Sequence, residues 1–463
     1  MQAATRIPST RSYDLQELIF RSEEFVREKI LAVLRAEPKL QVGPIDYAHT
    51  VKFPGSHPVK AQEIIETIRK EIDLSNEVTT YAHLPVCRYH CSFCHYPTLV
   101  SHDPQASRTY IDLLIAESEI FRRAVPEVKR RGVSSLYVGG GTPTLAEDSD
   151  LLRLMEYFRG SYELSKNAEI TIEATPETLV PEKIAKLSEI GFSRVSVGVQ
   201  VLDDIRLAEY HRQHTVAEAI AAVQALLEAQ VFKVNVDLIY GLPNQSIQQF
   251  AHDVHQIAQL QPTSVTLYRL RLQRSDELGK TAMSRQYAAS PELFPTQEIT
   301  YAMQMVGRQI LLANGYIERP SGWFTLAGNT IRVYDDRWYR QLPLIAFGWW
   351  TYSYSGKYEY RNHHDMKDYR ARINRGQLPI EECYGYDAIE RCRRFFQFRL
   401  KSCYAVHLAD MLRTQENRAI ASSYYSRQLD QLVGLGLANR FPDTLLLTDV
   451  GKVMIEEILS ALV

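Results

Sequence analysis

From about Thr79 onward, short apolar runs alternate with longer amphipathic runs. The short runs are rich in β-branched residues, and they predict six strands, Thr79–Leu84, Ser135–Val138, Glu169–Glu173, Arg194–Val199, Asn235–Tyr240 and Ser264–Leu267. The longer runs repeat apolar residues at helical spacing, and they predict five helices, Arg108–Arg123, Ser149–Phe158, Pro181–Ile190, Val216–Ala229 and Ser246–Leu260. Strands that alternate with helices are typical of parallel sheets. We therefore expect an α/β fold, either an open doubly wound sheet or part of a (β/α) barrel.

Two flanking regions lack this alternation, so the pattern predicts three parts, 1–75, 76–320 and 321–463. The first part is an extension with helical patterns at Leu15–Leu34 and Ala61–Ile72. The third begins with an aromatic-rich stretch, Trp323–Tyr369, and its end, Tyr425–Asp449, predicts a helix, a turn and a short hairpin. This end is typical of a winged-helix module, which we interpret as a lid that packs over the barrel.

Composition and charge narrow the class of protein. Of the 463 residues, 45% are hydrophobic and 23% charged, which is typical of globular proteins. The 53 basic residues are balanced by 55 acidic ones, so nucleic-acid binding has little electrostatic support. There is no run of about 18 apolar residues, and the amino terminus lacks the apolar core of a secretory signal. We expect a cytoplasmic protein with a small-molecule substrate and neither a membrane nor a nucleic-acid partner.

Polar and glycine-rich features lie at or just after the carboxyl ends of the predicted strands. They are a cysteine cluster, Gly139–Thr144 (GGGTPT), Glu173–Pro176 (EATP), Gln200 and Asp237. Because the carboxyl ends of parallel strands meet at one edge of a barrel, we expect these features to form one active site there.

The six cysteines are unevenly placed. Cys87, Cys91 and Cys94 form a C-x3-C-x2-C motif. The other three are late and scattered, and we expect them to be buried or idle: Cys383, Cys392 and Cys403. Three thiolates from one loop suit an iron–sulfur cluster or zinc. A structural zinc site normally has four ligands, and a nearby histidine could supply the fourth: His83, His90 or His95. Spacing alone leaves both metals open.

The cysteine motif after the first strand resembles the signature of radical S-adenosylmethionine (SAM) enzymes. Further blocks resemble the oxygen-independent coproporphyrinogen III oxidase family: GGGTPT (139–144), EATP (173–176), GFSRVSVGVQ (191–200), HRQHT (211–215) and VDLIYGLP (236–243). The resemblance is strong over about residues 79–275 and weak over 356–379 and the tail. It implies a partial (β/α)6 radical SAM barrel with an N-terminal helical extension and a mainly helical, winged-helix-like C-terminal module.

The resemblance also implies the cofactors and their chemistry. Cys87, Cys91 and Cys94 would be the catalytic, metal-binding residues that hold a [4Fe–4S] cluster with one open iron. That iron would bind SAM, and a low-potential donor such as a flavodoxin or ferredoxin would drive its cleavage to methionine and a 5′-deoxyadenosyl radical. The cofactor carries this chemistry, while the protein orients it and excludes water.

Site residues follow by resemblance. Three positions match contacts to the cluster-bound SAM: Tyr81, Gly140 and Glu173. Six match contacts to a second SAM: Phe93, Gly141, Thr142, Gln200, Arg212 and Asp237. Arg212 and Asp237 carry the opposite charges that suit the zwitterionic methionine end of a ligand, or they could pair with each other.

Two departures decide which branch of the family is favoured. Tyr96 stands where the oxidases usually carry a fourth cysteine, and Val333–Trp338 lacks the His-Asn pair of the heme-chaperone branch. What remains resembles radical C-methyltransferases and cyclopropane-forming enzymes, so methylation or cyclopropanation of an unsaturated substrate is our primary prediction. The alternative is a coproporphyrinogen oxidase-like oxidoreductase of porphyrin metabolism, or a heme chaperone. The arginines that follow the sixth strand could bind substrate carboxylates or form a solvated loop: Arg269, Arg271 and Arg274.

Overall fold

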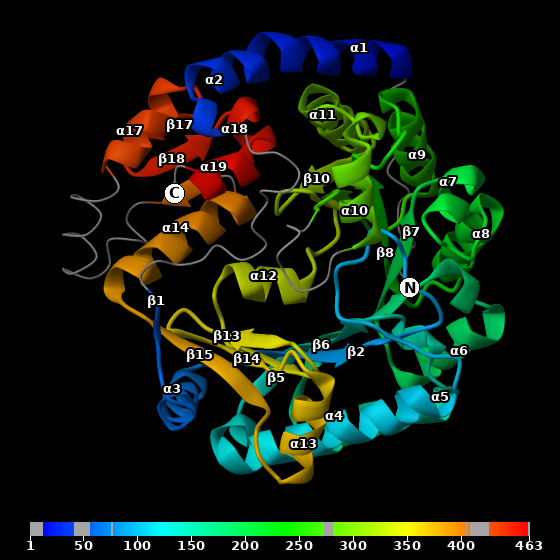
Figure 1. Cartoon of the computed structure of the whole chain (residues 1–463), viewed down its shortest axis with the longest axis vertical. Helices are drawn as coiled ribbons and strands as arrows, with labels where there is room; N and C mark the ends of the chain where they lie inside the picture. The colour runs from blue at the N-terminus through cyan, green and yellow to red at the C-terminus, as the bar shows by residue number, and fades with distance from the viewer. Residues whose placement is uncertain are drawn as a thin grey trace.

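Six parallel strands form the centre of a 13-stranded mixed sheet (Figure 1). The computed structural model describes residues 13–40, 56–75, 77–272, 281–403, 405–407 and 426–461. The parallel strands occur in chain order: β2 (Glu77–Leu84), β5 (Gly132–Gly140), β6 (Glu163–Ala174), β7 (Arg194–Gln200), β8 (Lys233–Tyr240) and β9 (Ser264–Arg269). Each contains or overlaps a strand that the sequence predicts, so the predicted α/β class is confirmed.

Helices follow these strands in the predicted order: α4 (Gln105–Ala124), α5 (Asp148–Ser161), α6 (Pro181–Ile190), α8 (Val216–Glu228) and α9 (Ile247–Leu260). Local signals fix their ends. Thr215 and Glu218 form a reciprocal capping box at the start of α8. Gly191 ends α6 in the left-handed region, with φ of 95°. Residues 204–209 add a short helix, α7 (Asp204–Glu209), that the pattern did not predict.

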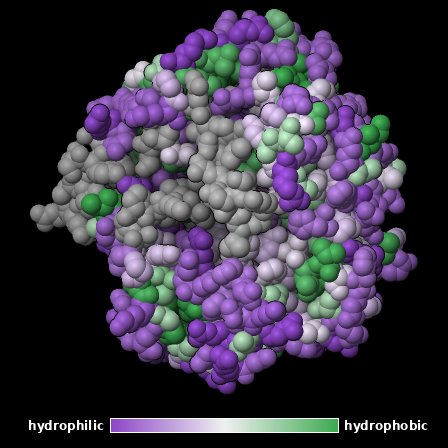
Figure 2. Space-filling view, in the orientation of Figure 1, coloured by the Kyte–Doolittle hydropathy of each residue, from purple (hydrophilic) through white to green (hydrophobic). Residues whose placement is uncertain are grey.

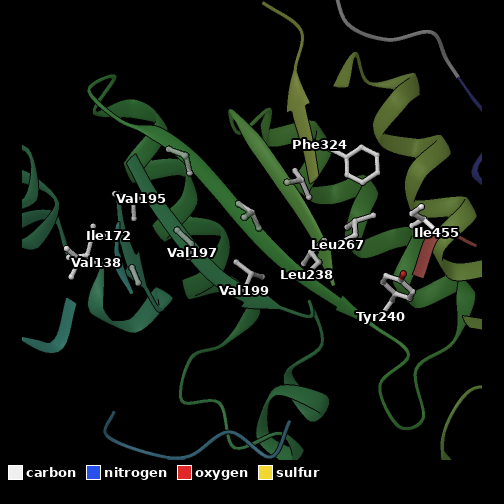
Figure 3. Packing of buried hydrophobic residues seen from close by; sticks show 14 of the residues in the cluster. Val138, Ile172, Val195, Val197, Val199, Leu238, Tyr240, Leu267, Phe324 and Ile455 are labelled. Atoms are coloured by element: carbon white, nitrogen blue, oxygen red, sulfur yellow. The ribbon is translucent and has the colours of Figure 1, made fainter. Parts of the chain in front are cut away.

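The hydrophobic core consists of buried side chains that lie on the strands and between the strands and the helices. Val195, Val197 and Val199, at alternate positions of β7, are fully buried among aliphatic neighbours such as Leu238 (Figure 3). The residues that alternate with these valines belong to the opposite face of β7 and are polar or small: Arg194, Ser196 and Gly198.

The sheet continues beyond both edges of the predicted region. Next to β2 lies a seventh parallel strand, β12 (Leu344–Phe347). Antiparallel strands follow it: β13 (Tyr352–Tyr354), β14 (Tyr358–Asn362), β15 (Ile380–Tyr386) and β1 (Ser56–Pro58). Beyond β9 lie β11 (Trp323–Leu326) and β10 (Tyr316–Glu318), also antiparallel. One sheet thus crosses both predicted boundaries, after residue 75 and after residue 320, and the three-part division stays a prediction.

The amino-terminal helical segment crosses the top of the molecule in Figure 1. It consists of α1 (Leu15–Phe25), a π-helical turn at Val26–Ile30 and α2 (Leu31–Ala36), where the pattern predicts one continuous helix. The segment packs on α11 (Gln297–Ala313), and α3 (Ala61–Leu74) packs against β14 and β15.

The carboxyl-terminal part is mainly helical. Its elements are α12 (Val333–Tyr339), α13 (Met366–Asn374), α14 (Ala388–Cys403), β16 (Ala405–His407), α17 (Ser426–Gly434), β17 (Ala438–Phe441), β18 (Thr444–Leu447), α18 (Asp449–Val453) and α19 (Ile455–Ala461). The predicted helix, turn and hairpin correspond to α17, β17 and β18, although Tyr425 lies outside the described residues.

Two arginines of the β9 end bind α19 through glutamates. Arg269 is 2.8 Å from Glu457, and Arg271 is 3.4 Å from Glu456. These arginines therefore fix the carboxyl-terminal helix to the barrel in this structure. Arg274, which was grouped with them, lies outside the described residues.

Hydrophobic residues are scattered in small groups among hydrophilic ones on the face shown in Figure 2. Within the described ranges, no helix combines the length and apolarity that crossing a bilayer requires.

Candidate active site at the carboxyl ends of the strands

The cysteine loop begins where β2 ends. Cys87 lies in the short strand β3 (Val86–Cys87), which pairs with β4 (Leu99–Val100). The loop between them carries Cys91 and Cys94, and the Cys94 N–H donates to the Cys91 carbonyl at 3.0 Å. All three thiols are free and half-buried. The pairing of β3 and β4 closes the loop at its base, so three thiols are presented from one short segment.

The glycine-rich turn after β5 is hydrogen-bonded to the chain segment that leads into this loop. The Gly141 N–H donates to the Leu84 carbonyl at 2.9 Å, and the Thr142 N–H donates to the Val86 carbonyl at 2.9 Å. A Cβ atom on Gly141 would be 2.6 Å from the Pro85 carbonyl, so the close approach requires glycine. Thr142 Oγ1 lies 3.7 Å from the Cys87 Sγ, which places the turn against the first thiol.

Glu173 is held beside the same turn. Its Oε1 accepts a hydrogen bond from the Tyr137 hydroxyl at 2.7 Å, and its Oε2 accepts one from the Gly140 N–H at 2.8 Å. Burial raises the pKa of this carboxyl, and both hydrogen bonds act against that shift. Gly140 has φ of 121°, a conformation that side chains rarely adopt. The carboxylate is therefore fixed in place at the carboxyl end of β6.

Arg212 connects the cysteine loop to β7. Its Nη1 donates to Cys91 Sγ at 3.5 Å and its Nη2 donates to the Gly198 carbonyl at 2.5 Å. Gln200, at the end of the same strand, has φ of 73°. A Cβ atom added at Gly198 would lie only 2.6 Å from the amide nitrogen of the Gln200 side chain. Gln200 is thus held in an uncommon backbone conformation beside the Arg212 side chain.

Asp237 is half-buried on β8 and is hydrogen-bonded to neighbouring residues. It accepts hydrogen bonds from Ser196 at 3.0 Å and Asn235 at 2.8 Å, and burial raises its pKa. In the part of the chain that the structure describes, no ion pair joins Asp237 to Arg212. Of the two arrangements that the sequence left open for these residues, direct pairing is therefore not the one observed.

Two aromatic residues complete the set that the sequence singled out. The Phe93 ring meets the Tyr210 ring edge-on at 6.4 Å. The Tyr81 hydroxyl is 3.1 Å from His83 Nδ1, and its ring lies 5.7 Å from that of Tyr137. Most of the residues implied by the resemblance lie at the carboxyl ends of β5 to β7 or in the loops that follow the strands, whereas Tyr81 and Asp237 lie within β2 and β8.

The sequence did not predict two contacts that hold the cysteine loop, those of Glu177 with Tyr89 and with His214. The Tyr89 hydroxyl donates to Glu177, and His214 Nδ1 is 3.3 Å from the same carboxylate. Burial acts to raise the pKa of Glu177, but its contacts with His214 and Tyr89 outweigh burial and hold the pKa at about 2. Glu177 follows the EATP block directly, and His214 lies within HRQHT. Their place in these motifs was a signal that could have identified them.

Arg332 was also missed. It directly precedes α12, its guanidinium lies 5.5 Å from the Tyr137 ring centre, and it pairs with Asp335. Its segment contains none of the motifs, so the sequence offered no signal for it.

The mouth of the site is lined with accessible tyrosines. Tyr96, Tyr268 and Tyr352 are 56%, 38% and 39% exposed, although they come from three separate segments. Tyr96 lies within electrostatic range of Glu173 and Asp237, and Tyr268 and Tyr352 lie within range of Tyr96. These side chains suit contact with a flat, unsaturated molecule.

The three thiols fit an iron–sulfur cluster by their chemistry. Burial raises the pKa of Cys87 to about 11 and that of Cys94 to about 12, so metal binding would displace their protons. Among the described residues, no three His, Cys, Asp or Glu side chains are grouped closely enough for a single ion. In a cluster each thiolate binds its own iron, so the sulfurs need not converge on one point.

Two of the three histidines proposed as zinc ligands, His83 and His95, have other contacts. His83 lies 3.1 Å from the Tyr81 hydroxyl and 3.2 Å from the Pro97 carbonyl, and burial lowers its pKa to about 4. His95 stacks on Tyr96 at 4.6 Å. Both histidines therefore support the loop through contacts with its own residues and with β2.

Comparison with known families identifies the domain. Residues 81–257 match the model of the radical SAM superfamily. The chain thus contains a radical SAM domain, whose cofactors are a [4Fe–4S] cluster and SAM.

Curated relatives and a solved structure agree with this assignment. The heme chaperone HemW of Haemophilus influenzae is 23% identical over 83% of this chain and 97% of its own length. The oxygen-independent coproporphyrinogen III oxidase of Pseudomonas aeruginosa is 27% identical over 71% of this chain and 73% of its own. The fold is similar to that of the coproporphyrinogen III oxidase HemN from Escherichia coli. That comparison gives a TM-score of 0.76 at 21% identity and covers 91% of this chain and 99% of the other.

Proposed function

We propose that this chain is a radical SAM enzyme that acts on a tetrapyrrole of the porphyrin type. The observation that carries the proposal is the joining of the three-cysteine loop to the strand ends by Arg212, Thr142 and the glycine turn. A bound cluster and SAM would supply a carbon-centred radical by one-electron reductive cleavage. The proposed ligands of the cluster are Cys87, Cys91 and Cys94.

The remaining site residues would bind and orient SAM. The Glu173 carboxylate, already fixed by Tyr137 and Gly140, offers an acceptor for a ligand amino group. The close turn at Gly141 lets backbone approach the ligand where a Cβ atom would collide. Tyr81 presents its ring next to Tyr137, over the same strand ends. These positions were implied by the family resemblance, and they remain a proposal.

The tetrapyrrole assignment is favoured by the relatives and by the mouth of the site. The relatives described above are a heme chaperone and coproporphyrinogen III oxidases. They support the alternative that the sequence offered and not its primary prediction, C-methylation. The accessible rings of Tyr96, Tyr268 and Tyr352 suit a flat, conjugated substrate. Tyr96 replaces a cysteine of the oxidases, so we expect the steps after hydrogen abstraction to differ from theirs.

An anaerobic assay tests this function. The reconstituted protein is supplied with SAM, a strong reductant and either coproporphyrinogen III or heme. We expect 5′-deoxyadenosine and methionine to form, faster when a tetrapyrrole is present, with a new tetrapyrrole product. Formation of 5′-deoxyadenosine that no tetrapyrrole accelerates would contradict the substrate class. Tight heme binding without SAM cleavage would instead favour a chaperone.

Methyl transfer from a second SAM remains the second candidate. The buried Arg212 binds the Gly198 carbonyl of β7, Asp237 lies on the neighbouring strand β8, and among the described residues no ion pair joins the two. Their opposite charges could bind the carboxylate and the amino group of a second SAM. Methyl transfer must release S-adenosylhomocysteine together with 5′-deoxyadenosine, whereas oxidative decarboxylation releases carbon dioxide. Turnover without S-adenosylhomocysteine would exclude this candidate.

A further inference from the structure

A second cavity lies at the opposite end of the barrel from the cysteine loop. It is a small cavity of about 30 Å³, partly open to solvent, between the sheet, α12 and α14. Asn235 and Ser264, which line it, lie at the amino-terminal ends of β8 and β9. The cysteines follow the carboxyl end of β2, so the two sites lie at opposite ends of the parallel strands. The position of α12 between the sheet and α14 can be seen in Figure 1.

Arginines dominate the charged groups that line this cavity. Four of them are Arg319, Arg332, Arg340 and Arg399, and the carboxylates are Asp335 and Asp336. With four positive and two negative groups, the lining carries a formal charge of +2. The whole chain carries −2, so positive charge is concentrated here. An electropositive hollow in a protein of this balance favours an anionic ligand.

The two carboxylates of the lining neutralise only part of the charge of its four arginines. Asp335 pairs with Arg332, and Asp336 is 3.4 Å from Arg340. Within the described ranges no carboxylate forms an ion pair with Arg399, whose guanidinium lies 5.3 Å from the Phe395 ring centre. The Arg399 side chain can therefore receive an oxyanion without first breaking an ion pair.

The cavity also contains a buried donor that has no acceptor. Trp323 lines it, and among the described residues the indole N–H of Trp323 has no hydrogen-bond partner. An indole nitrogen can only donate, and a buried donor without an acceptor is unfavourable. Asn235 cannot relieve it, because its amide already binds Ser196, Asp237, Ser264 and Thr266. Guanidinium and indole donors together are complementary to an oxygen anion.

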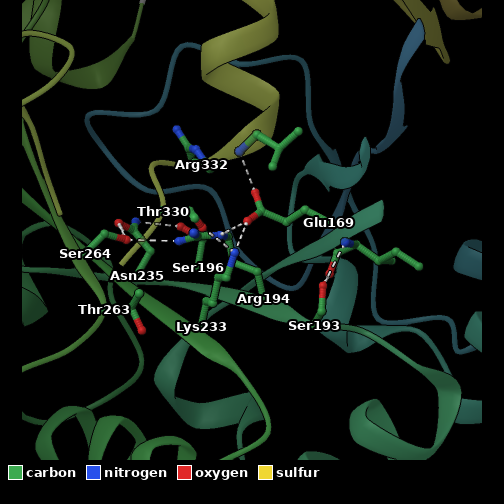
Figure 4. A network of polar contacts seen from close by, with 12 residues as sticks. Glu169, Ser193, Arg194, Ser196, Lys233, Asn235, Thr263, Ser264, Thr330 and Arg332 are labelled. Atoms are coloured by element: carbon green, nitrogen blue, oxygen red, sulfur yellow. Dashed lines mark hydrogen bonds and ion pairs between the residues drawn. The ribbon is translucent and has the colours of Figure 1, made fainter. Parts of the chain in front are cut away.

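The surrounding residues make the cavity a built site. Figure 4 shows Arg332, Asn235 and Ser264 close to the buried pair Arg194–Glu169. Arg194 donates to the Ser264 hydroxyl at 3.1 Å, and Glu169 accepts from the Val333 N–H at 2.9 Å, at the start of α12. These contacts hold one wall of the cavity in a fixed position.

We propose that this cavity binds an oxyanion, either a carboxylate of an organic acid or a phosphate, at a site separate from the SAM site. Arg399 and Arg340 would bind the oxygen atoms, since the planar guanidinium matches both anions. The Trp323 N–H would donate to the same group. Arg332 lines this cavity and also lies over the Tyr137 ring beside Glu173. A single side chain would therefore connect the bound anion to the SAM-binding end of the barrel.

Calorimetric titration of the full chain with a reconstituted cluster tests the proposal. Inorganic phosphate and succinate are titrated separately at constant ionic strength, without reductant. We expect saturable binding of at least one anion, weakened about tenfold in Arg399→Gln. Trp323→Phe keeps an aromatic side chain but removes the N–H donor, so it should also weaken binding. The matched control is Arg370→Gln, an exposed arginine of α13, which should bind as wild type does.

Each outcome decides the proposal. Binding of phosphate alone identifies a phosphate site, and binding of succinate identifies a carboxylate site. No saturable binding of either anion would overturn it, as would unchanged affinity in both Arg399→Gln and Trp323→Phe. Circular dichroism checks that each variant folds. Arg340→Gln changes the other arginine proposed to bind the anion, and because its side chain is exposed, it provides a second test variant. SAM cleavage plays no part in this readout, so failure of the proposed enzymatic function would leave the test intact.

Discussion

Arg212 donates a hydrogen bond to the Sγ of Cys91 across 3.5 Å while its other nitrogen binds the Gly198 carbonyl. The arginine is 7% exposed, so its charge is largely removed from water. One buried cation thus joins the middle cysteine of the loop to strand β7.

Replacing Arg212 by Lys should impair the cysteine loop, because lysine keeps the charge but cannot make both contacts. We expect less iron per chain after reconstitution and a 5′-deoxyadenosine rate reduced about tenfold or more. The control is Arg206→Ala, which breaks a more exposed pair with Glu209 and should change stability by about 0–1 kcal/mol. Wild-type iron content and rate in Arg212→Lys would show that the contact is dispensable.

Gly141→Ala should disturb the turn beneath the loop. The new Cβ atom would be 2.6 Å from backbone atoms of Pro85 and Val86, which cannot move away as a flexible side chain could. We expect a loss of about 1–3 kcal/mol in the free energy of unfolding by urea, together with poorer cluster retention. Gly160→Ala is the matched control, because no atom lies within 4 Å of its Cβ position in α5. Equal stability of the two variants would contradict the close approach.

The sequence could predict the barrel because its signals are local. The six strands and five helices follow from apolar periodicity, and the cysteine motif lies in one loop. Leu344–Phe347 was not predicted as a parallel strand, since its partner β2 lies far earlier in the chain and no β-α unit precedes it. The Tyr89–Glu177 contact joins two segments far apart in the chain, and Arg332 reaches Tyr137 from the segment just before α12. Contacts of this kind depend on tertiary packing, which periodicity does not encode.

Arg269→Ala should loosen the carboxyl-terminal helix α19. The variant leaves Glu457, which is fully buried, without its ion pair at 2.8 Å. Removing one partner of a buried pair costs about 3–5 kcal/mol, so hydrogen exchange in α19 should speed up markedly. Arg440→Ala removes an exposed pair with Asp430 and should have little effect. Unchanged exchange in α19 would mean that other contacts hold this helix.

Stability should fall with rising pH because of Glu117. Burial raises the pKa of this carboxyl from 4.5 to about 8, against hydrogen bonds from Tyr369, Asn362 and Gly348. The folded state therefore binds the proton more tightly than the unfolded state. The resulting stability is present below about pH 4.5 and is lost as pH rises toward 8, by an amount on the order of a few kcal/mol.

Glu117→Gln should flatten this part of the pH profile of urea unfolding, because the amide does not titrate. Glu189→Gln, an exposed residue of α6, should leave the profile as in wild type. A Glu117→Gln profile that still falls between pH 4.5 and 8 would assign the dependence to other groups.

The central claim is that the loop of Cys87, Cys91 and Cys94 holds the cluster at which SAM is cleaved. Its most direct test measures iron, sulfide and 5′-deoxyadenosine in cysteine-to-alanine variants reconstituted without oxygen. We predict that Cys91→Ala retains neither the cluster nor SAM cleavage. Cys392→Ala removes a buried thiol of α14, away from the loop, and should retain both. A stable cluster with normal 5′-deoxyadenosine formation in Cys91→Ala, or loss of both in Cys392→Ala, would contradict the claim.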